Sequence, residues 1–353
     1  MGMRLNTTFP SGRPRGVPRP GQDFERTEIT PIQYDPNHPF KCNNFVYRLA
    51  LPSGVVGSSC KFRQPGCVPI PIGAKEFIPR LSNSEAHGMH QETRVQNEVS
   101  MLTLASAALR HIEPHVDYPL PESIKGWGGV TFDDSGAIVS APMVSVGAGP
   151  WSSLEESYRD RLKAALAKTD TNPTFRVGEQ RASEGESTPP DNLLYDPATG
   201  RITALLDYDF SSIQHPAYEF FRSFATNGGQ LCGWLDDNTL QGQEAELLRN
   251  AKLSGQFPSP LPTRTDSHDG GLAVDWELAQ VWEEALQKLD VKRPSTIPGI
   301  DKLADADEVL GSLLPWRLAN EDLLRMNQDE DTRAALKRIA EGHLISLLDH
   351  LGS

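Results

Sequence analysis

Apolar and polar residues alternate along the first part of the chain. Within residues 40–51, Phe45, Tyr47, Leu49 and Leu51 recur at every second position and alternate with Val46, Arg48 and Ala50. This period of two is typical of a strand with one buried face, and residues 52–54 supply the turn that follows. A further strand is expected at 75–82, where Pro79 cannot donate to a sheet and therefore predicts an edge or a bulge.

Later segments have the apolar spacing of helices. Residues 91–111 carry the apolar positions Val95, Val99, Leu102 and Leu109. Their spacing predicts a helix that buries this face. A second amphipathic helix is expected at 152–168, and the chain beyond residue 215 is expected to be largely helical, with a polar loop near 255–271. Glu98 flanks the first apolar face, so it lies either in solvent at the rim or, if buried, beside a cation.

The segment between these helices has weaker patterns. Gly126, Gly128 and Gly129 do not follow the spacing of a phosphate-binding loop and are interpreted as a turn. A short strand is expected from Ala137 to Met143. Residues 169–191 are polar and without periodicity, which indicates an irregular connection.

A β-hairpin is the clearest local prediction. A short strand at 193–195, a turn at 196–200 and a return strand at 201–206 follow one another, with proline and glycine at the positions that the turn requires. Asn192 and Asp207 stand at the two mouths of this hairpin and should lie close in space. Amide and carboxylate oxygens suit Mg²⁺. On spacing alone, Asn192 could equally cap a turn and Asp207 end a strand.

The hairpin carries a resemblance to a known family. The run DNLLYDPATGRITALLDYDFSSIQHPAYEFF (191–221) is similar to the metal-binding hairpin of the aminoglycoside phosphotransferase and choline kinase family, especially its fungal members. The resemblance implies a kinase-like fold and a cofactor pair of Mg²⁺ with ATP or GTP. It also implies that Asn192 and Asp207 are the two magnesium ligands and that Asp209, the family's acid two positions later, belongs to the same metal site.

Two further segments resemble the same family in the same order. The run FIPRLSNSEAHGMHQETRVQNEVSMLTLA (77–105) is similar to the family's third strand and following helix. The resemblance implies that Arg80 contacts nucleotide phosphates and pairs with Glu98, with Lys75 as a weaker alternative to Arg80. The nucleotide would lie near Arg80 and a hinge that ends at Met143. The run LPWRLANEDLL (314–324) resembles a C-terminal helix of the fungal members.

The catalytic loop of this family is not recognisable here. The family's catalytic Asp stands five residues before the metal-binding Asn, a position that Ser187 occupies, and Gly185 stands where the family has His. Glu186 is a weak substitute base. The 49 positions from Met143 to Asn192 are about half of what the family uses, so a block of the chain is expected to be missing before about residue 185.

The expected fold class is α+β, a protein-kinase-like two-lobed fold that lacks part of its C-terminal lobe. The expected organisation is a flexible N-terminal tail (1–39), a β-rich nucleotide-binding lobe (40–144) and a helical lobe (145–353) that contains the metal-binding hairpin (191–209). By resemblance the protein transfers phosphate from a nucleotide to a hydroxyl of a small molecule. The alternatives are a catalytically dead nucleotide-binding pseudokinase or scaffold, and the product of a truncated gene model.

Composition limits the classes of binding partner and the cellular compartment that are expected. The 353 residues carry a net charge of −13, which argues against nucleic acid as a partner and is compatible with a cationic acceptor. No apolar run reaches the length of a membrane helix, so no membrane partner is expected. The four cysteines form no C-x-x-C pair, which argues against zinc and fits a reducing, cytoplasmic compartment. The sequence does not indicate the oligomeric state.

Overall fold

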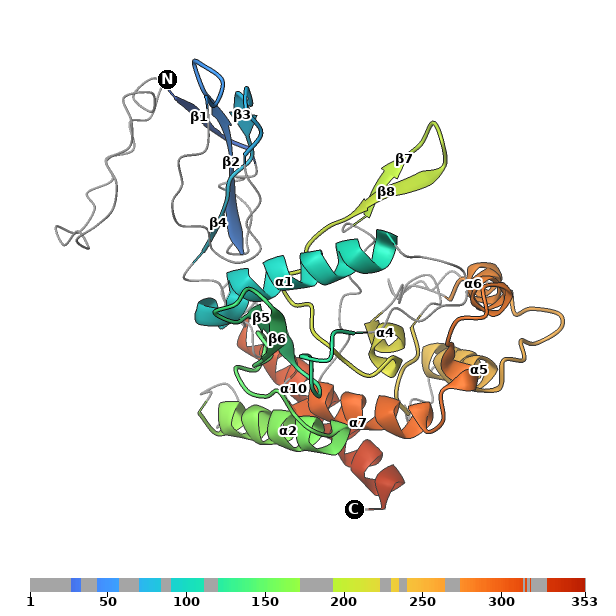
Figure 1. The fold of residues 1–353 in the computed structure, drawn as a ribbon. Coiled ribbons are helices and arrows are strands. Elements are labelled where there is room, and N and C mark those ends of the chain that lie inside the picture. The colour runs from blue at the N-terminus through green and yellow to red at the C-terminus, as the bar shows by residue number, and fades with distance from the viewer. Residues whose placement is uncertain are drawn as a thin grey trace. The chain divides into compact units, whose positions relative to one another are not determined.

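A computed structural model describes twelve stretches of the chain (Figure 1). They are residues 27–32, 43–56, 70–83, 90–110, 120–171, 193–222, 230–234, 240–263, 274–313, 315, 318 and 329–352. The chain divides into two compact units. The first consists of Met1–Asn37, Asn44–Arg63 and Cys67–Asn83, and the second consists mainly of Ser84–Ser353.

The first unit contains a four-stranded antiparallel sheet around the predicted strand. Strand β2 (Asn44–Ala50) pairs with β1 (Glu28–Pro31), β3 (Glu76–Phe77) and β4 (Arg80–Ser82). The expected strand at 75–82 is confirmed but divided, because Pro79 lies between β3 and β4 as its missing N–H predicts. One expectation is corrected. Part of the supposed flexible tail is β1, whose backbone groups pair with β2, for example at Ile29 and Leu49.

In the second unit, helix α1 (Gln91–Arg110) packs on the hairpin of β5 (Gly129–Phe132) and β6 (Ile138–Ala141). Met101, Leu104 and Val130 form the core of this contact, with Ile138 and Ile213 packed against it. The carboxylate of Asp133 closes the hairpin by accepting hydrogen bonds from the Ser135 hydroxyl and from the backbone N–H groups of Ala137 and Ser135, and these bonds lower the pKa of Asp133.

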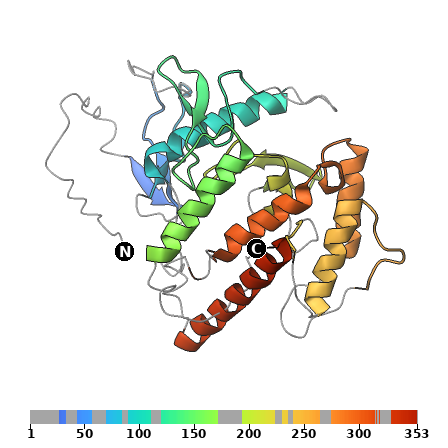
Figure 2. The ribbon, with the colours of Figure 1, turned by 90° about the horizontal axis from the view of Figure 1, so that it is seen from below.

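Three described helices of the second unit pack against α7 (Ile300–Leu313). They are α2 (Leu154–Thr171), α4 (Ala217–Arg222) and α10 (Glu330–Leu351), and Figure 2 shows α2, α7 and α10 side by side. The core at this point combines Phe220, Phe221, Leu231, Ile297, Ile300 and Ala304. Asp329 caps the start of α10 through the Thr332 N–H.

Helices α5 (Leu240–Ser254) and α6 (Trp276–Lys288) enclose a smaller core of Leu248, Ala251, Trp276 and Ala279. A short 3₁₀ helix, η3 (Pro294–Thr296), follows α6. Charged groups are buried here: Lys252 of α5 is 1% exposed, and Glu283 of α6 pairs with Arg293 at 3.0 Å. Burial lowers the pKa of Lys252 to about 8 and raises the pKa of Glu283.

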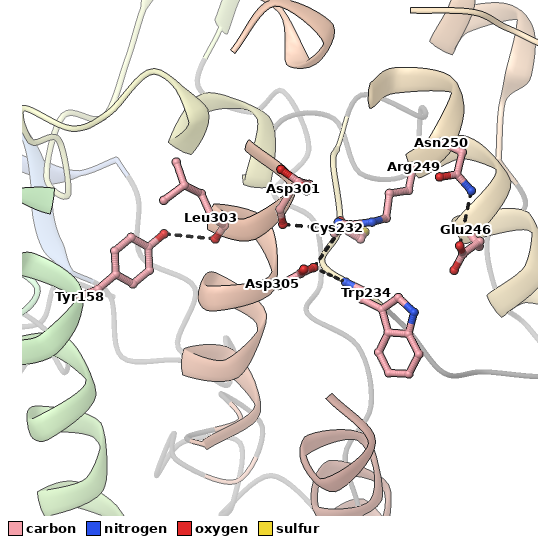
Figure 3. Close-up of polar contacts among 9 residues, drawn as sticks. All are labelled: Tyr158, Cys232, Trp234, Glu246, Arg249, Asn250, Asp301, Leu303 and Asp305. Carbon is pink, nitrogen blue, oxygen red and sulfur yellow. Dashed lines mark hydrogen bonds and ion pairs between the residues drawn. The ribbon is translucent and has the colours of Figure 1, made fainter. Parts of the chain in front are cut away.

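A buried ion pair joins α5 to α7 (Figure 3). Arg249 Nη2 lies 2.9 Å from Asp305 Oδ1, and its Nη1 donates to the Cys232 carbonyl at 2.6 Å. The same Asp305 oxygen accepts the Trp234 N–H at 2.8 Å. The pair therefore holds the segment around 232–234 against two helices, while Tyr158 of α2 donates to the Leu303 carbonyl of α7.

The architecture is thus mixed α+β, with small antiparallel sheets and, within the described residues, seven α-helices. Its division differs from the boundary expected near residue 144. Helix α1 and the β5–β6 hairpin, which were expected in the first lobe, belong to the second unit because α1 packs on β5. None of the described helices has the combination of length and apolar character that crossing a bilayer requires.

Candidate functional site

The predicted hairpin is present. Strands β7 (Leu193–Asp196) and β8 (Arg201–Leu205) pair antiparallel, with Leu193 opposite Leu205. Asp196 organises the turn, since its carboxylate accepts from the Ala198 N–H and the Thr199 hydroxyl. Gly200 completes the turn with a φ of +67°, a conformation that glycine adopts without strain. The hairpin delivers the chain to Asp207, two residues after β8.

Asp207 has an unusual backbone conformation. Its φ is +60°, in the left-handed region that non-glycine residues rarely adopt. The side chain is exposed, and its Oδ1 accepts a long hydrogen bond of 3.4 Å from the Asp209 N–H. Strained residues of this kind persist where the surrounding structure holds them, and they cluster at functional sites.

A buried ion pair fixes Asp209. Arg94 Nη2 of α1 lies 2.7 Å from Asp209 Oδ2, and both side chains are 1% exposed. The two residues are 115 positions apart in the sequence, so the pair joins the segment after β8 to the helix. An uncompensated charge at either position would be costly, so each of the two side chains requires the other in order to stay buried.

Asn97, one turn further along α1, fixes the same segment downstream. Its Nδ2 donates to the Ser211 carbonyl at 2.9 Å, and its Oδ1 accepts the Val130 N–H at 2.9 Å. Gly128 and Ile213 then exchange two backbone hydrogen bonds of 3.0 and 2.7 Å. Residues 209–213 are therefore held to both α1 and β5, and the candidate site is the anchored segment 207–213.

Several predicted site residues cannot be placed. Asn192, Ser187 and Glu186 lie outside the described residues, as does most of 314–324. Arg80 is exposed in β4, opposite Val46. Glu98 is half-buried on α1, in the other compact unit. The proposed pairing of Arg80 with Glu98 therefore stays a prediction.

Met143 lies buried in a turn after β6. Its N–H donates to the Ala148 carbonyl at 2.8 Å, and its carbonyl accepts from the Gly147 N–H at 2.7 Å. Its sulfur lies 3.8 Å from Gln214 Nε2, next to the anchored segment. A nucleotide base that used the backbone N–H of Met143 would have to displace the bond to Ala148. The role of Met143 as a nucleotide contact stays a prediction.

Two of the predicted metal-site residues, Asp207 and Asp209, are described, and their surroundings differ. Asp207 fits a metal ligand because its carboxylate is exposed at the end of the hairpin. Asp209 has the opposite setting, since its carboxylate is buried against a guanidinium group. Among the residues that the structure describes, no three His, Cys, Asp or Glu side chains gather in a way that could hold a metal. Asn192 lies outside the described residues, so among the predicted metal-site residues Asp207 is the one whose described surroundings fit a metal ligand.

Sequence reasoning missed Arg94 and Asn97, the two side chains that hold the segment. A signal was present: Arg94, Asn97, Met101 and Leu104 recur at spacings of three and four and share one face of α1. That face is buried, whereas Val95, Leu102 and Leu109 of the predicted face are exposed.

Comparison of the chain with protein-family models, with curated proteins and with solved structures found no match in any of the three.

Proposed function

We propose that the chain binds a magnesium nucleotide, ATP or GTP, in the manner of a small-molecule phosphotransferase with a two-lobed, kinase-like fold. Asp207 is the metal ligand at the end of the hairpin, and Asn192 is its partner at the hairpin's other mouth. A hydroxyl group of a small molecule is the acceptor class. Mg²⁺, when bound, would bridge the nucleotide phosphates and offset their negative charge.

One observation carries this proposal: an exposed carboxylate stands in a strained conformation on a segment that buried contacts hold in place. The strain of a left-handed non-glycine residue is of order 1–3 kcal/mol. A metal ligand needs its oxygens presented at a fixed position, which the contacts of Asp209 and Ser211 favour.

Turnover is proposed to be slow. The position of the family's catalytic Asp is Ser187, and a positioned general base contributes about 10²–10⁴-fold. Glu186 is the substitute base if turnover is substantial. The second candidate function, a nucleotide-binding pseudokinase, is favoured by the same absence of His-Gly-Asp from the sequence before Asn192.

The test is nucleotide binding by the full chain. Calorimetry with ATP or GTP should detect binding that depends on Mg²⁺, and Asp207→Asn should weaken it by at least about tenfold, as loss of a metal-site residue does. Asp134→Asn is the matched control, because Asp134 is an exposed carboxylate in the β5–β6 turn. Absence of magnesium-dependent binding at millimolar nucleotide would refute the proposal.

Consumption of nucleotide, measured against amino-sugars and amino alcohols, separates enzyme from pseudokinase. Turnover in the ordinary range of about 1–10³ per second, lost in Asp207→Ala, would identify an active enzyme. Glu186→Gln would then test the substitute base. Binding without turnover would identify the pseudokinase.

A further inference from the structure

We infer that Asp209 anchors the segment that presents Asp207 and is not itself a metal ligand, which makes Arg94 a positioning residue of the metal site. The inference rests on the proposed function and assigns separate roles to the two acids of the Asp207-x-Asp209 pair. It also gives a role to Arg94, which the family resemblance does not name.

The surroundings of Asp209 oppose a direct role in metal binding. Its Oδ2 accepts from Arg94 Nη2 at 2.7 Å, and the side chains of both residues are almost fully buried. A magnesium ion keeps several waters and near-ideal octahedral geometry. A site at this carboxylate would have to place a divalent cation and its waters beside a buried guanidinium group. Two positive charges bound to the same carboxylate would repel each other strongly, because the effective dielectric is low in a buried site.

The same contact reaches Asp207 through the backbone. The Asp209 N–H donates to Asp207 Oδ1, so fixing Asp209 orients the carboxylate two residues earlier. Asn97 holds the Ser211 carbonyl, two residues later. Asp207 thus follows a hairpin on one side and an anchored segment on the other. Without the Arg94 contact, residues 207–211 can rotate, and Asp207 can leave the left-handed region.

The two possible roles of Asp209 predict opposite effects of removing Arg94. If Asp209 were a metal ligand, the guanidinium group would compete with the ion, and Arg94→Met would leave metal binding unchanged or tighten it. If Asp209 is an anchor, Arg94→Met and Asp209→Asn remove the same support. Each should then weaken binding, and the double variant should bind about as well as the weaker single variant, because the two residues act as one unit.

The experiment measures Mn²⁺ binding by electron paramagnetic resonance in the presence of ATP, with the full chain. Arg94→Met and Asp209→Asn should each lose about 10–100-fold in Mn²⁺ affinity, the range found for residues that support metal ligands. Glu155→Gln is the control: it removes an exposed carboxylate of α2 in the same unit, and it should leave Mn²⁺ affinity unchanged. Tighter or unaltered binding in Arg94→Met, with weaker binding in Asp209→Asn, would overturn the inference.

A second readout works without metal or nucleotide. Hydrogen exchange of the amides between residues 207 and 213 should accelerate in Arg94→Met and in Asp209→Asn, and should stay unchanged in Glu155→Gln. If the wild-type chain binds no Mn²⁺ with ATP, the proposed function fails, and this exchange alone decides the anchoring: unaltered exchange overturns it. Where a neutral variant does not fold, Arg94→Lys keeps the charge but changes the hydrogen-bonding geometry, and it should show the same effects at smaller size.

Discussion

Replacement of Arg249 by methionine should strongly destabilise the second unit. Arg249 joins three parts of that unit, since it contacts Asp305 of α7, the Cys232 carbonyl and, at 3.5 Å, the Asp301 carbonyl (Figure 3). The side chains of Arg249 and Asp305 are only 9% and 7% exposed. The pair is therefore a buried one, for which removal of a single partner costs more than the pair itself contributes.

The magnitude follows from what is left behind. In Arg249→Met the Asp305 carboxylate stays buried without its countercharge, and the Cys232 carbonyl loses a donor. Breaking a buried pair in this way costs about 3–5 kcal/mol. Asp305→Asn keeps an oxygen that can accept the Trp234 N–H. The double variant removes both charges, so its cost should fall short of the sum of the single variants by about 1–3 kcal/mol.

The assay is urea unfolding, monitored through tryptophan fluorescence. All six tryptophans lie beyond residue 126, so the signal reports the second unit alone. The control is Glu155→Gln on α2, which removes the exposed partner of Arg159 and should cost under about 0.5 kcal/mol. A loss below about 1 kcal/mol for Arg249→Met, or costs that simply add in the double variant, would refute the reasoning.

Three further changes test other parts of the structure. Between pH 8 and the usual pKa of 10.5, the unfolded chain binds the Lys252 proton that the folded chain releases, because burial lowers the pKa of Lys252 to about 8. Between pH 7.5 and 10.5 the free energy of unfolding of the wild type should therefore rise by up to about 3 kcal/mol relative to that of Lys252→Met, as urea unfolding of both proteins can measure. The comparison with the variant is needed because burial raises the pKa of Cys232 to about 12, which lowers stability over the upper part of the same window. Asn97→Ala leaves the Val130 N–H and the Ser211 carbonyl without their partner, and the midpoint in urea should fall by an amount equivalent to about 2–4 kcal/mol. Asp207→Gly relieves the positive φ, so thermal unfolding should show stability unchanged or raised by up to about 1 kcal/mol, while calorimetry shows magnesium-dependent nucleotide binding lost.

Local elements were predictable because their causes are local. The alternation at 45–51 predicted the strand that is β2, and the turn residues at 196–200 predicted the β7–β8 hairpin. The helix predicted at 91–111 is α1. The helix predicted at 152–168 is α2, which begins two residues later. In each case the pattern and the turn chemistry act within a few residues, where sequence spacing and spatial distance are nearly the same.

The buried face of α1 was predicted wrongly. The period of Val95, Leu102 and Leu109 is helical, yet these side chains are exposed, and Arg94 and Asn97 are fully buried. A hydrophobic pattern counts polar residues as outward because burial without a partner is costly. The partners here are Asp209 and the backbone groups of Val130 and Ser211, which lie far along the chain and which no period within α1 can reveal.

The polar face of α1 makes hydrogen bonds and an ion pair that an apolar face could not make. A leucine at position 97 could fill a similar volume, but it would leave the Val130 N–H and the Ser211 carbonyl unpaired. Apolar packing tolerates small sliding, whereas a hydrogen bond or ion pair is lost when its atoms move by an ångström or so. The segment that follows β8 is therefore fixed in register by directional contacts. Because that register sets the direction of the Asp207 carboxylate, the chemistry proposed for Asp207 depends on Arg94 of α1, 115 positions before Asp209, as directly as on the hairpin beside it.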